Sequence, residues 1–410
     1  MKCRHCDVNL STVFVDLNAS PPSNSYLTND SIKNSEKWYP LKVMVCEECW
    51  LVQTEDFVGA DEMFSEDYAY FSSFSSSWLE HASNYVDSVV TRFNLTETNN
   101  IVEVAANDGY LLQYVMQKKI PCYGIEPTHS TAVAARNKGI EIIEEFFGEQ
   151  KAKELVRYGR QADLTVANNV LAHVPDINDF VKGFATLLTP NGVATFEFPH
   201  LLNLENYVQF DTIYHEHYSY LSLIAVKSIF EKNGLSVFDV TELPTHGGSL
   251  RVYSQRSDTG QHSTSLSVPS LLIKEKQLRM NKQDFYQGFQ NKVEKVKVEF
   301  LEFLISAKKN EKIVVAYGAA AKGSTLMNFV GIQRDFIKYV VDKNPNKIGK
   351  YMPGSRLPIL EESQIRFDKP DYVVIFPWNL SDEIMKQLSY IREWNGSFVV
   401  AVPELKIIKA

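Results

Sequence analysis

The chain has 410 residues, of which 44% are hydrophobic, and it carries a formal net charge of −8 at pH 7. This length predicts two or three domains, and the acidic balance argues against a broad nucleic-acid-binding surface. The first residues lack the apolar core of a signal peptide, and no apolar run reaches membrane-spanning length. We therefore expect a cytoplasmic protein, a monomer or a weak dimer, with neither a membrane nor a nucleic acid as its partner.

Two Cys-x-x-Cys pairs, Cys3 with Cys6 and Cys46 with Cys49, supply four of the five cysteines. Four thiolates in two such clips match the tetrahedral ligand set of a structural Zn²⁺, which leaves no coordination position open for catalysis. Two disulfides or a redox Cys-x-x-Cys are alternatives. They are less favoured because nothing suggests export and the pairs come as a matched set. Residues 1–65 are therefore predicted to form a zinc-binding module with a long polar insertion.

A segment rich in aromatic residues and serine leads from this module into alternating strands and helices. Strands are predicted at residues 101–105, 122–126, 140–143, 164–167 and 192–198, and helices at 77–93, 110–118, 130–138 and 180–188. Such alternation is typical of a parallel, doubly wound sheet whose ligand lies at the carboxyl ends of the strands. We expect this α/β domain over residues 66–256.

The turn after the first of these strands distinguishes between nucleotide ligands. Small residues at Ala105, Ala106 and Gly109 let a ligand approach the backbone, and Glu126 ends the next strand, where a carboxylate can accept both ribose hydroxyls. The turn lacks the glycines of G-x-G-x-x-G, and Asp108 would repel a pyrophosphate but not a cationic sulfonium. The pattern favours S-adenosylmethionine over NAD, with an ordinary strand-to-helix turn as the alternative.

Residues 211–220 contain two histidines, a glutamate and three tyrosines. His215 and His217 could be metal ligands, but no third ligand lies at a recognisable spacing, so acid/base use is favoured. Histidine titrates near pH ~6.5, which suits a base at neutral pH, and a nearby tyrosine can donate a hydrogen bond to an oxyanion. A single histidine would more often be a core residue. Further on, His246 and Arg251 flank a flexible turn suited to binding substrate oxygens.

The pattern then changes to charged, amphipathic helices, and residues 257–310 are predicted to be a helical linker. A second α/β unit follows over residues 311–410. Its strands are expected at residues 313–316, 337–341, 372–376 and 397–402. This alternation predicts a Rossmann-like domain at the C-terminus.

A small-residue turn opens this second unit. Residues 319–324 place backbone N–H groups and Lys322 at a helix start, which could cradle a diphosphate. Asp342 ends the next strand, as a ribose-binding acid would, and this also suits NAD. The NAD interpretation is weaker because the turn lacks G-x-G-x-x-G, and a packing turn without a ligand is an equal alternative.

Several motifs together resemble one enzyme family. They are the paired Cys-x-x-Cys module, Asp67-Tyr68-Ala-Tyr70, residues 102–109, Tyr214-His-Glu-His217, His246-Gly-Gly-x-x-Arg251, Tyr317-Gly-Ala-x-Ala-Lys322 and Phe376-Pro-Trp-Asn379. In combination they resemble the C-methyltransferases that act on nucleotide-linked 4-keto-deoxysugars, over essentially the whole chain. Residues 168–173 also resemble the N-x-L-x-H run that flanks the methyl donor in class I methyltransferases.

The resemblance implies an α/β protein with three parts. These are an N-terminal zinc-binding module, a class I methyltransferase (Rossmann-like) middle domain for S-adenosylmethionine, and a Rossmann-like C-terminal domain that helps to hold the nucleotide sugar. It implies that His217 removes the proton from sugar C-3 and that Tyr214 stabilises the enolate at O-4. His173 and Tyr68 match further active-site positions, the tyrosine near the methyl donor.

The residues expected to act in the site fall into four groups. The catalytic group is Tyr68, His173, Tyr214, Glu216 and His217. The donor-binding group is Tyr68, Glu103, Ala105, Asn107, Asp108, Gly109, Glu126, Pro127, Phe146, Asn168, Asn169 and His173. The substrate-binding group is Tyr70, His246, Arg251, Tyr317, Lys322 and Asn379, and the zinc ligands are Cys3, Cys6, Cys46 and Cys49. The chain departs from the family at Ala105 and Ala106, where many members carry glycine or serine, and at His215, where some carry aspartate.

The function expected from these residues is S-adenosylmethionine-dependent methylation at C-3 of a dTDP-4-keto-6-deoxyhexose, through a histidine-catalysed enolate, in the making of a branched-chain deoxysugar. A zinc-ribbon RNA methyltransferase is an alternative, but it would need basic stripes that this acidic chain lacks. An NAD-dependent nucleotide-sugar oxidoreductase, or a nucleotide-binding scaffold without activity, is the third possibility.

Overall fold

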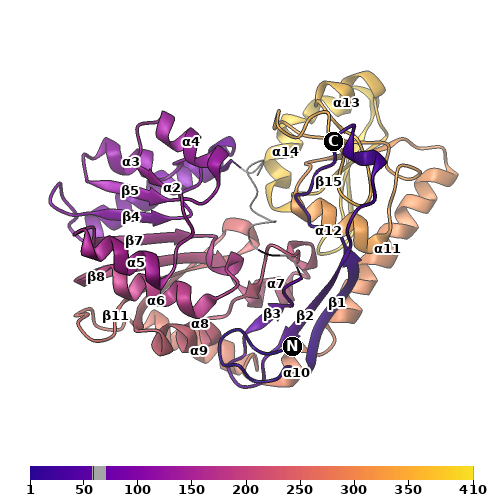
Figure 1. The fold of residues 1–410 in the computed structure, drawn as a ribbon. Helices are drawn as coiled ribbons and strands as arrows, with labels where there is room; N and C mark the ends of the chain where they lie inside the picture. Colours follow the sequence, from indigo (N-terminus) through magenta and orange to yellow (C-terminus); the bar gives the residue numbers. More distant parts are fainter. Residues whose placement is uncertain (58, 60–70, 410) are drawn as a thin grey trace.

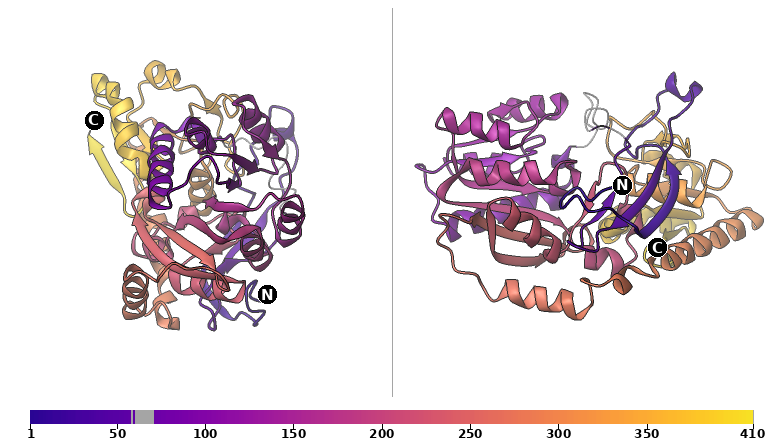
Figure 2. Two further views of the ribbon diagram at one scale, coloured as in Figure 1. Left: turned by 90° about the vertical axis from the view of Figure 1, so that its left-hand side faces the viewer. Right: turned by 60° about the horizontal axis from the view of Figure 1, so that its bottom comes forward.

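The computed structural model describes residues 1–57, 59 and 71–409. Tyr68 and Tyr70, expected in the site, lie outside the described residues. Figure 1 shows two α/β parts, one from the middle and one from the end of the chain, with the strands of the N-terminal sheet between them. Two further views in Figure 2 show the same arrangement from other sides. The three expected parts are therefore present.

The N-terminal sheet has four strands in the order β1-β2-β3-β9. Its strands are β1 (Thr12–Ser20), β2 (Tyr39–Val45), β3 (Val52–Thr54) and β9 (Ser219–Tyr220), all paired antiparallel. The last strand comes from the middle of the chain. It is the end of residues 211–220, which we call the histidine-rich segment. In this pairing Val52 lies opposite Tyr220 and Gln53 opposite Ser219. The metal-binding module and the histidine-rich segment thus share one sheet.

The middle domain is built on a seven-stranded sheet in the order β10-β11-β8-β7-β4-β5-β6. Its strands are β4 (Ile101–Val104), β5 (Cys122–Ile125), β6 (Ile142–Ile143), β7 (Ala162–Asn168), β8 (Leu188–Pro199), β10 (Leu235–Leu243) and β11 (Ser249–Arg256). β11 runs antiparallel to both β8 and β10, whereas the strands from β8 to β6 are parallel. This confirms the class I methyltransferase fold expected from the sequence.

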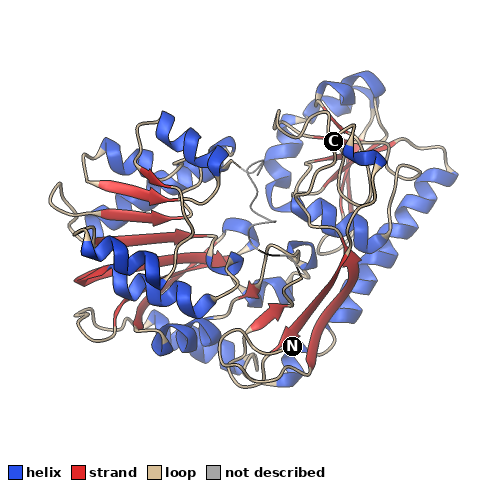
Figure 3. Ribbon diagram, viewed as in Figure 1, coloured by secondary structure: helices blue, strands red, loops and turns tan. Residues whose placement is uncertain are grey.

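Helices cover both faces of this sheet (Figure 3). They are α2 (Ser76–Arg92), α3 (Leu112–Gln117), α4 (His129–Asn137), α5 (Glu149–Arg157), α6 (Ile177–Leu187) and α8 (Leu223–Lys232). The buried leucines of α7 (Leu201–Asn206) pack instead with residues of the N-terminal sheet and the C-terminal domain. Alternate residues of one strand pack in different hydrophobic cores, because successive side chains of a strand point to opposite faces of the sheet. Ile101 of β4 packs with residues of α2, α3 and α4, whereas Val102 packs with residues of α5, α6 and α8. Different helices thus cover the two faces of the sheet.

The C-terminal domain has a six-stranded sheet in the order β14-β13-β12-β15-β16-β17. Its strands are β12 (Val314–Tyr317), β13 (Val340–Val341), β14 (Ile359–Leu360), β15 (Tyr372–Ile375), β16 (Ser397–Val400) and β17 (Lys406–Lys409), and only β17 is antiparallel. Its helices are α12 (Ala321–Val330), α13 (Ser363–Asp368) and α14 (Ser381–Gln387). This confirms the second Rossmann-like domain, although the strand expected at residues 337–341 pairs only at its end.

Helices lie between these two domains along the chain. They are α9 (Ser267–Gln277), α10 (Gln283–Tyr286) and α11 (Phe289–Lys309). α11 packs against both β1 and α12, so it joins the N-terminal sheet to the last domain. None of the helices within the described residues is long and apolar enough to cross a membrane.

The polar insertion of the N-terminal module packs on the C-terminal domain. Leu27 and Tyr351 exchange two backbone hydrogen bonds, of 3.0 and 2.8 Å. The Tyr26 hydroxyl donates to the Ala319 carbonyl oxygen at 2.6 Å. Glu36 pairs with Arg356 at 2.9 Å. The insertion therefore ties the metal-binding end of the chain to the last domain.

Candidate active site

The four cysteines of the N-terminal clips gather as the sequence predicts. Their sulfur atoms all lie within 4.8 Å of one another, and the described residues contain no other such cluster of metal-ligating side chains. Sulfur–sulfur distances of 3.5, 3.4 and 3.8 Å suit the edges of a tetrahedron around a metal, because Zn–S bonds measure ~2.3 Å. They are far longer than a disulfide bond of ~2.05 Å. The donor set fits zinc, with Cys3, Cys6, Cys46 and Cys49 as its ligands.

The turn after β4 has an unusual backbone. Ala105 and Asn107 adopt φ angles of 59° and 49°, and Gly109 one of 74°. Positive φ is sterically unfavourable for alanine, and such residues cluster at ligand sites. The positive φ of Gly109 favours glycine, and a Cβ there would also crowd Ala135 and Ile140. The chain therefore makes a tight turn at the carboxyl end of β4.

Two buried carboxylates border this turn. Glu126, directly after β5, accepts hydrogen bonds from the N–H groups of Asn107 at 2.8 Å and Thr128 at 3.0 Å. Asp108 accepts one from the Ser73 N–H at 3.2 Å through one oxygen. Its other oxygen is buried and has no hydrogen-bond partner within the part of the chain that the structure describes. Acidic groups here suit a cation and ribose hydroxyls better than a pyrophosphate, so the residues fit a sulfonium nucleotide.

The other donor-site residues expected from the sequence surround this turn less closely. Glu103 lies on β4 itself, fully buried, where burial raises its pKa well above the usual range, and its carboxylate oxygens have no hydrogen-bond partner among the described residues. Pro127 follows Glu126 at the end of β5. Phe146 lies beyond the end of β6 with 50% of its surface exposed. Ligand contact at these three positions stays a prediction.

Asparagines lie where β7 ends. Asn168 is its last residue and is buried, and Asn169 follows with a φ of 54°. The Asn169 N–H donates to the Glu197 carbonyl oxygen at 2.7 Å, and its side-chain amide lies 2.9 Å from Nε2 of His246. Since the amide N–H must be the donor, His246 presents a lone pair at Nε2. Burial, with the charge of Lys322 adding to it, lowers the pKa of His246 to about 4.

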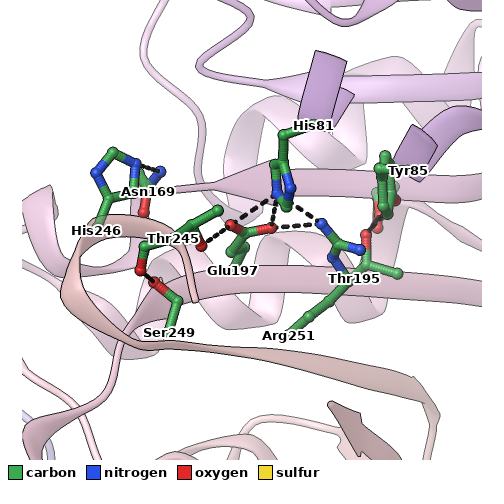
Figure 4. A network of polar contacts seen from close by, with 10 residues as sticks. His81, Tyr85, Asn169, Thr195, Glu197, Thr245, His246, Ser249 and Arg251 are labelled. Carbon is green, nitrogen blue, oxygen red and sulfur yellow. Dashed lines mark hydrogen bonds and ion pairs between the residues drawn. The ribbon is translucent and has the colours of Figure 1, made fainter. Parts of the chain in front are cut away.

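A buried ion cluster lies beside these residues, at the end of β8 (Figure 4). Glu197 receives the Arg251 guanidinium at 2.5 Å, Nε2 of His81 at 2.9 Å and the Thr245 hydroxyl at 2.9 Å. Burial alone would raise the pKa of Glu197, but His81 and Arg251 lower it to about 2. Arg251 also lies over the Tyr85 ring at 4.4 Å. The guanidinium expected to bind substrate is thus held by a carboxylate of the sheet.

Three rings form the centre of the site. The His217 ring centroid lies 4.5 Å from that of His173 and 4.0 Å from that of Tyr214. Nδ1 of His217 donates to the Thr212 carbonyl oxygen at 2.8 Å. A carbonyl can only accept, so the proton lies on Nδ1 and Nε2 carries the lone pair.

Both histidines are held neutral by their surroundings. Burial, reinforced by His173, His246 and Lys322, lowers the pKa of His217 well below its usual range. Burial lowers the pKa of His173 to about 4. A neutral imidazole with a free ring nitrogen is the state that a general base needs.

The two residues between Tyr214 and His217 in the sequence contact the N-terminal module. Glu216 is buried, and its carboxylate accepts hydrogen bonds from the Ser23 hydroxyl at 2.9 Å and the Asn24 N–H at 3.3 Å. The His215 ring lies 3.2 Å from the Pro40 carbonyl oxygen. The structure therefore places Glu216 and His215 against the N-terminal chain, whereas His217 and Tyr214 lie with His173.

The C-terminal domain contributes a cation to the same site. Lys322, in the first turn of α12, donates to the Asn379 side-chain oxygen at 2.7 Å and lies 4.1 Å from the Trp378 ring. The Trp378 indole N–H donates to the Asp211 carboxylate at 2.7 Å. Burial lowers the pKa of Lys322 to about 8 and raises that of Asp211 to about 6. Tyr317, at the end of β12, accepts a hydrogen bond from Gln387 at 2.9 Å.

Comparison with known proteins decides the family. The C-methyltransferase NovU of Streptomyces niveus is 32% identical over 409 residues, which cover 100% of this chain and 97% of NovU. The chain belongs to the C-methyltransferase family. Residues 3–64 match a family described as "Putative zinc binding domain", residues 78–240 one described as "Methyltransferase domain", and residues 244–403 one described as "C-methyltransferase C-terminal domain".

Solved structures with a similar middle domain are more distant. Magnesium protoporphyrin IX methyltransferase of Synechocystis PCC 6803 is 16% identical, with a TM-score of 0.34 over 44% of this chain and 79% of that one. An S-adenosylmethionine-dependent methyltransferase of Clostridium acetobutylicum is 12% identical, with a TM-score of 0.36 over 45% and 92% of the two chains.

Some residues of this C-methyltransferase site escaped the sequence analysis. Asp211, Glu197 and Trp378 lie inside or beside segments that the motifs marked, yet no spacing assigned them a role. His81 lies in α2, outside all of the motifs. A sequence signal existed near two of them, since Asp211 begins residues 211–220 and Trp378 lies inside the motif Phe376-Pro-Trp-Asn379.

Proposed function

We propose that this C-methyltransferase transfers a methyl group from S-adenosylmethionine to C-3 of a dTDP-linked 4-keto-6-deoxyhexose. A carbonyl at C-4 acidifies the C-3 proton, because its loss gives an enolate whose charge rests on O-4. The reaction therefore needs a neutral base beside a hydrogen-bond donor. His217 and Tyr214 meet that need, with ring centroids 4.0 Å apart.

The orientation of His217 carries the proposal. Its Nδ1–H is anchored on the Thr212 carbonyl oxygen, so Nε2 is the atom that can accept the C-3 proton. His173, packed against the same ring, limits how far the imidazole can turn. Tyr214 would stabilise the developing oxyanion, and one such donor is worth about 2.7–4 kcal/mol.

The two ligands would approach this centre from different domains. S-adenosylmethionine, when bound, supplies an electrophilic methyl group. Glu126, Asp108 and the tight turn at Ala105 would hold it at the carboxyl end of β4. Lys322 and Asn379 would hold the nucleotide diphosphate from the C-terminal domain. Holding the methyl donor and the sugar in line can lower the activation free energy by about 7–11 kcal/mol.

Mass spectrometry in water and in D₂O tests the proposal. The pure protein is incubated with S-adenosylmethionine and a dTDP-4-keto-6-deoxyhexose, and a control omits the donor. We expect one added methyl group, and deuterium exchange at C-3 in the control. Exchange without methylation would mean that the mechanism is right and the sugar wrong. Neither signal, across gluco, 3-deoxy and 3-amino sugars, would favour an RNA methyltransferase or an oxidoreductase.

Two variants test the residue roles in the same assay. His217→Ala should lose both exchange and transfer, and Tyr214→Phe should lower both by about a hundredfold, because one oxyanion donor has gone. Calorimetry should show unchanged donor binding in each, since neither residue borders the turn after β4. An active double variant would contradict the assignment.

A further inference from the structure

Arg4 lies inside the first cysteine clip, between Cys3 and Cys6, yet its side chain is only 6% exposed. Its guanidinium lies among backbone carbonyl groups of other segments. One nitrogen donates to the Thr54 carbonyl oxygen at 2.7 Å, and the other to the Pro175 carbonyl oxygen at 2.8 Å. A single side chain of the metal-binding clip therefore contacts two other segments of the chain.

One of those segments, and a third one that the guanidinium faces, bear the histidines of the site. Pro175 comes two residues after His173. On the other side, the Arg4 guanidinium lies 5.2 Å from the ring centroid of Tyr218, which directly follows His217. The cation is balanced by Asp56, which it contacts at 2.6 Å.

Thr54 extends this link to the base itself. Its hydroxyl donates to the His217 carbonyl oxygen at 3.0 Å, and its N–H donates to the Tyr218 carbonyl oxygen at 3.1 Å. The Tyr218 N–H in turn donates to the Ala172 carbonyl oxygen at 2.8 Å, next to His173. Arg4 thus contacts the backbone two residues after His173, and Thr54 contacts the backbone of His217.

Gln53 anchors the same strand to the metal ligands. It is fully buried, and its amide donates to the Cys3 sulfur at 3.3 Å. Its side-chain oxygen accepts the Arg4 N–H at 2.9 Å. Movement of the clip would therefore be transmitted to β3, and from β3 to β9.

We propose that Arg4 is a positioning residue that sets the spacing of the His173 and His217 rings and so couples the metal-binding clip to proton abstraction. The inference rests on the proposed role of His217 as the base. A guanidinium suits this task because its planar fork can donate to two carbonyl oxygens at once while its face lies on an aromatic ring. A lysine offers no such fork.

The test compares Arg4→Ala with Lys2→Ala, which removes a cation from the same clip. Lys2 is exposed, and its ammonium pairs with exposed Asp7 at 2.9 Å, so it is the matched control. We expect Arg4→Ala to keep its zinc content and its donor affinity, both measured directly. The rate of deuterium exchange at sugar C-3, measured without S-adenosylmethionine, should fall by up to about a hundredfold, as expected when catalytic groups are misplaced by ~1 Å. Arg4→Lys should recover only a small part, and Lys2→Ala should match the parent protein.

Exchange at the parent rate in a zinc-loaded Arg4→Ala protein would overturn the proposal. Loss of zinc with the exchange rate retained would overturn it as well. If Arg4→Ala does not fold, the pair Thr54→Val and Thr54→Ser decides. Thr54→Val removes the hydroxyl that holds the His217 carbonyl oxygen and should slow exchange, whereas Thr54→Ser should restore it. Equal rates in the two would contradict the link.

Failure of the proposed function would look different, because the parent protein itself would then exchange no C-3 proton. A second readout also separates positioning from stability. The histidine ring protons, followed by NMR, should shift in Arg4→Ala and stay in place in Lys2→Ala. Unshifted rings with slowed exchange would place the effect elsewhere and overturn the role assigned to Arg4.

Discussion

At the scale of single residues, the site depends on keeping several imidazoles neutral. His173 and His246 have pKa values lowered to about 4 by burial, and that of His217 is also well below its usual range. Lys322 adds a positive charge nearby that further disfavours protonation of His217 and His246. Neutral imidazoles can accept a proton, so this arrangement favours proton abstraction. It also lowers the free energy of unfolding in acid.

We expect the free energy of unfolding to fall as the pH drops from 6.5 toward 4. In that window the unfolded chain binds protons at histidines whose usual pKa is 6.5, whereas the buried rings in the folded protein do not. Each such histidine contributes up to about 1.4 kcal/mol per pH unit. Urea unfolding at about pH 7 and about pH 5 measures the loss.

His173→Gln should flatten this pH dependence, because the glutamine does not titrate. His129→Gln is the control, since the His129 side chain is 60% exposed and its pair with Glu144 is on the surface. A parent-like slope in His173→Gln would show that His173 does not stay neutral in the folded protein.

At the scale of elements, the strands β4 to β8 of the middle domain were predicted, whereas β10, β11 and the tertiary partners of the strands were not. The runs at β4, β5, β7 and β8 are buried and apolar, so sequence pattern found them near their observed bounds. β9 has two residues and carries no periodicity. Its place in the N-terminal sheet depends on packing between residues far apart in the chain, which local pattern does not encode.

The same limit applies to the side chains of the site. His217 and Tyr214 stood out because several polar aromatic residues crowd one short segment. Arg4 carried no such signal, since an arginine beside a zinc ligand is usually a solvated surface residue. Only its burial and its contacts with Thr54 and Pro175 distinguish it.

The ion cluster that joins α2, β8 and β11 makes an element-scale prediction. Arg251→Met should lower the free energy of unfolding by about 3–5 kcal/mol, because it leaves Glu197 buried without its guanidinium. Urea unfolding is the measurement. Arg256→Met, on the same strand, removes an arginine whose partner Asp258 is 63% exposed and should cost at most about 1 kcal/mol.

The double variant Arg251→Met with Glu197→Gln separates charge burial from lost packing. It should recover part of the stability, since the unpaired charge is gone. Equal losses in Arg251→Met and Arg256→Met would mean that the cluster contributes no more than a surface pair.

At the scale of the whole molecule, the contact between Trp378 and Asp211 joins the C-terminal domain to the histidine-rich segment. Trp378→Phe removes the indole N–H from a buried carboxylate. We expect KM for the nucleotide sugar to rise about tenfold, the size of one hydrogen bond to a charged group, while donor affinity is unchanged. Steady-state kinetics and calorimetry check the two parts.

Trp394→Phe is the matched control for this prediction. Its indole N–H donates to the Pro370 carbonyl oxygen at 2.9 Å, a contact within the C-terminal domain alone. KM should therefore stay at the parent value. An equal rise in both variants would attribute the effect to the stability of that domain rather than to its contact with Asp211.

The position of β9 also determines the order in which the protein can be assembled during synthesis. β3 leaves the ribosome early, but its partner strand follows only after β4 to β8 have been made. Until then the open edge of β3, whose residues are all buried in the finished sheet, has no partner, and an unpaired edge invites aggregation. A nascent chain stalled before Ser219 would carry a finished metal clip beside an exposed edge. His217, the proposed base, would thus be set in place only when the first and middle parts of the chain pair in this sheet.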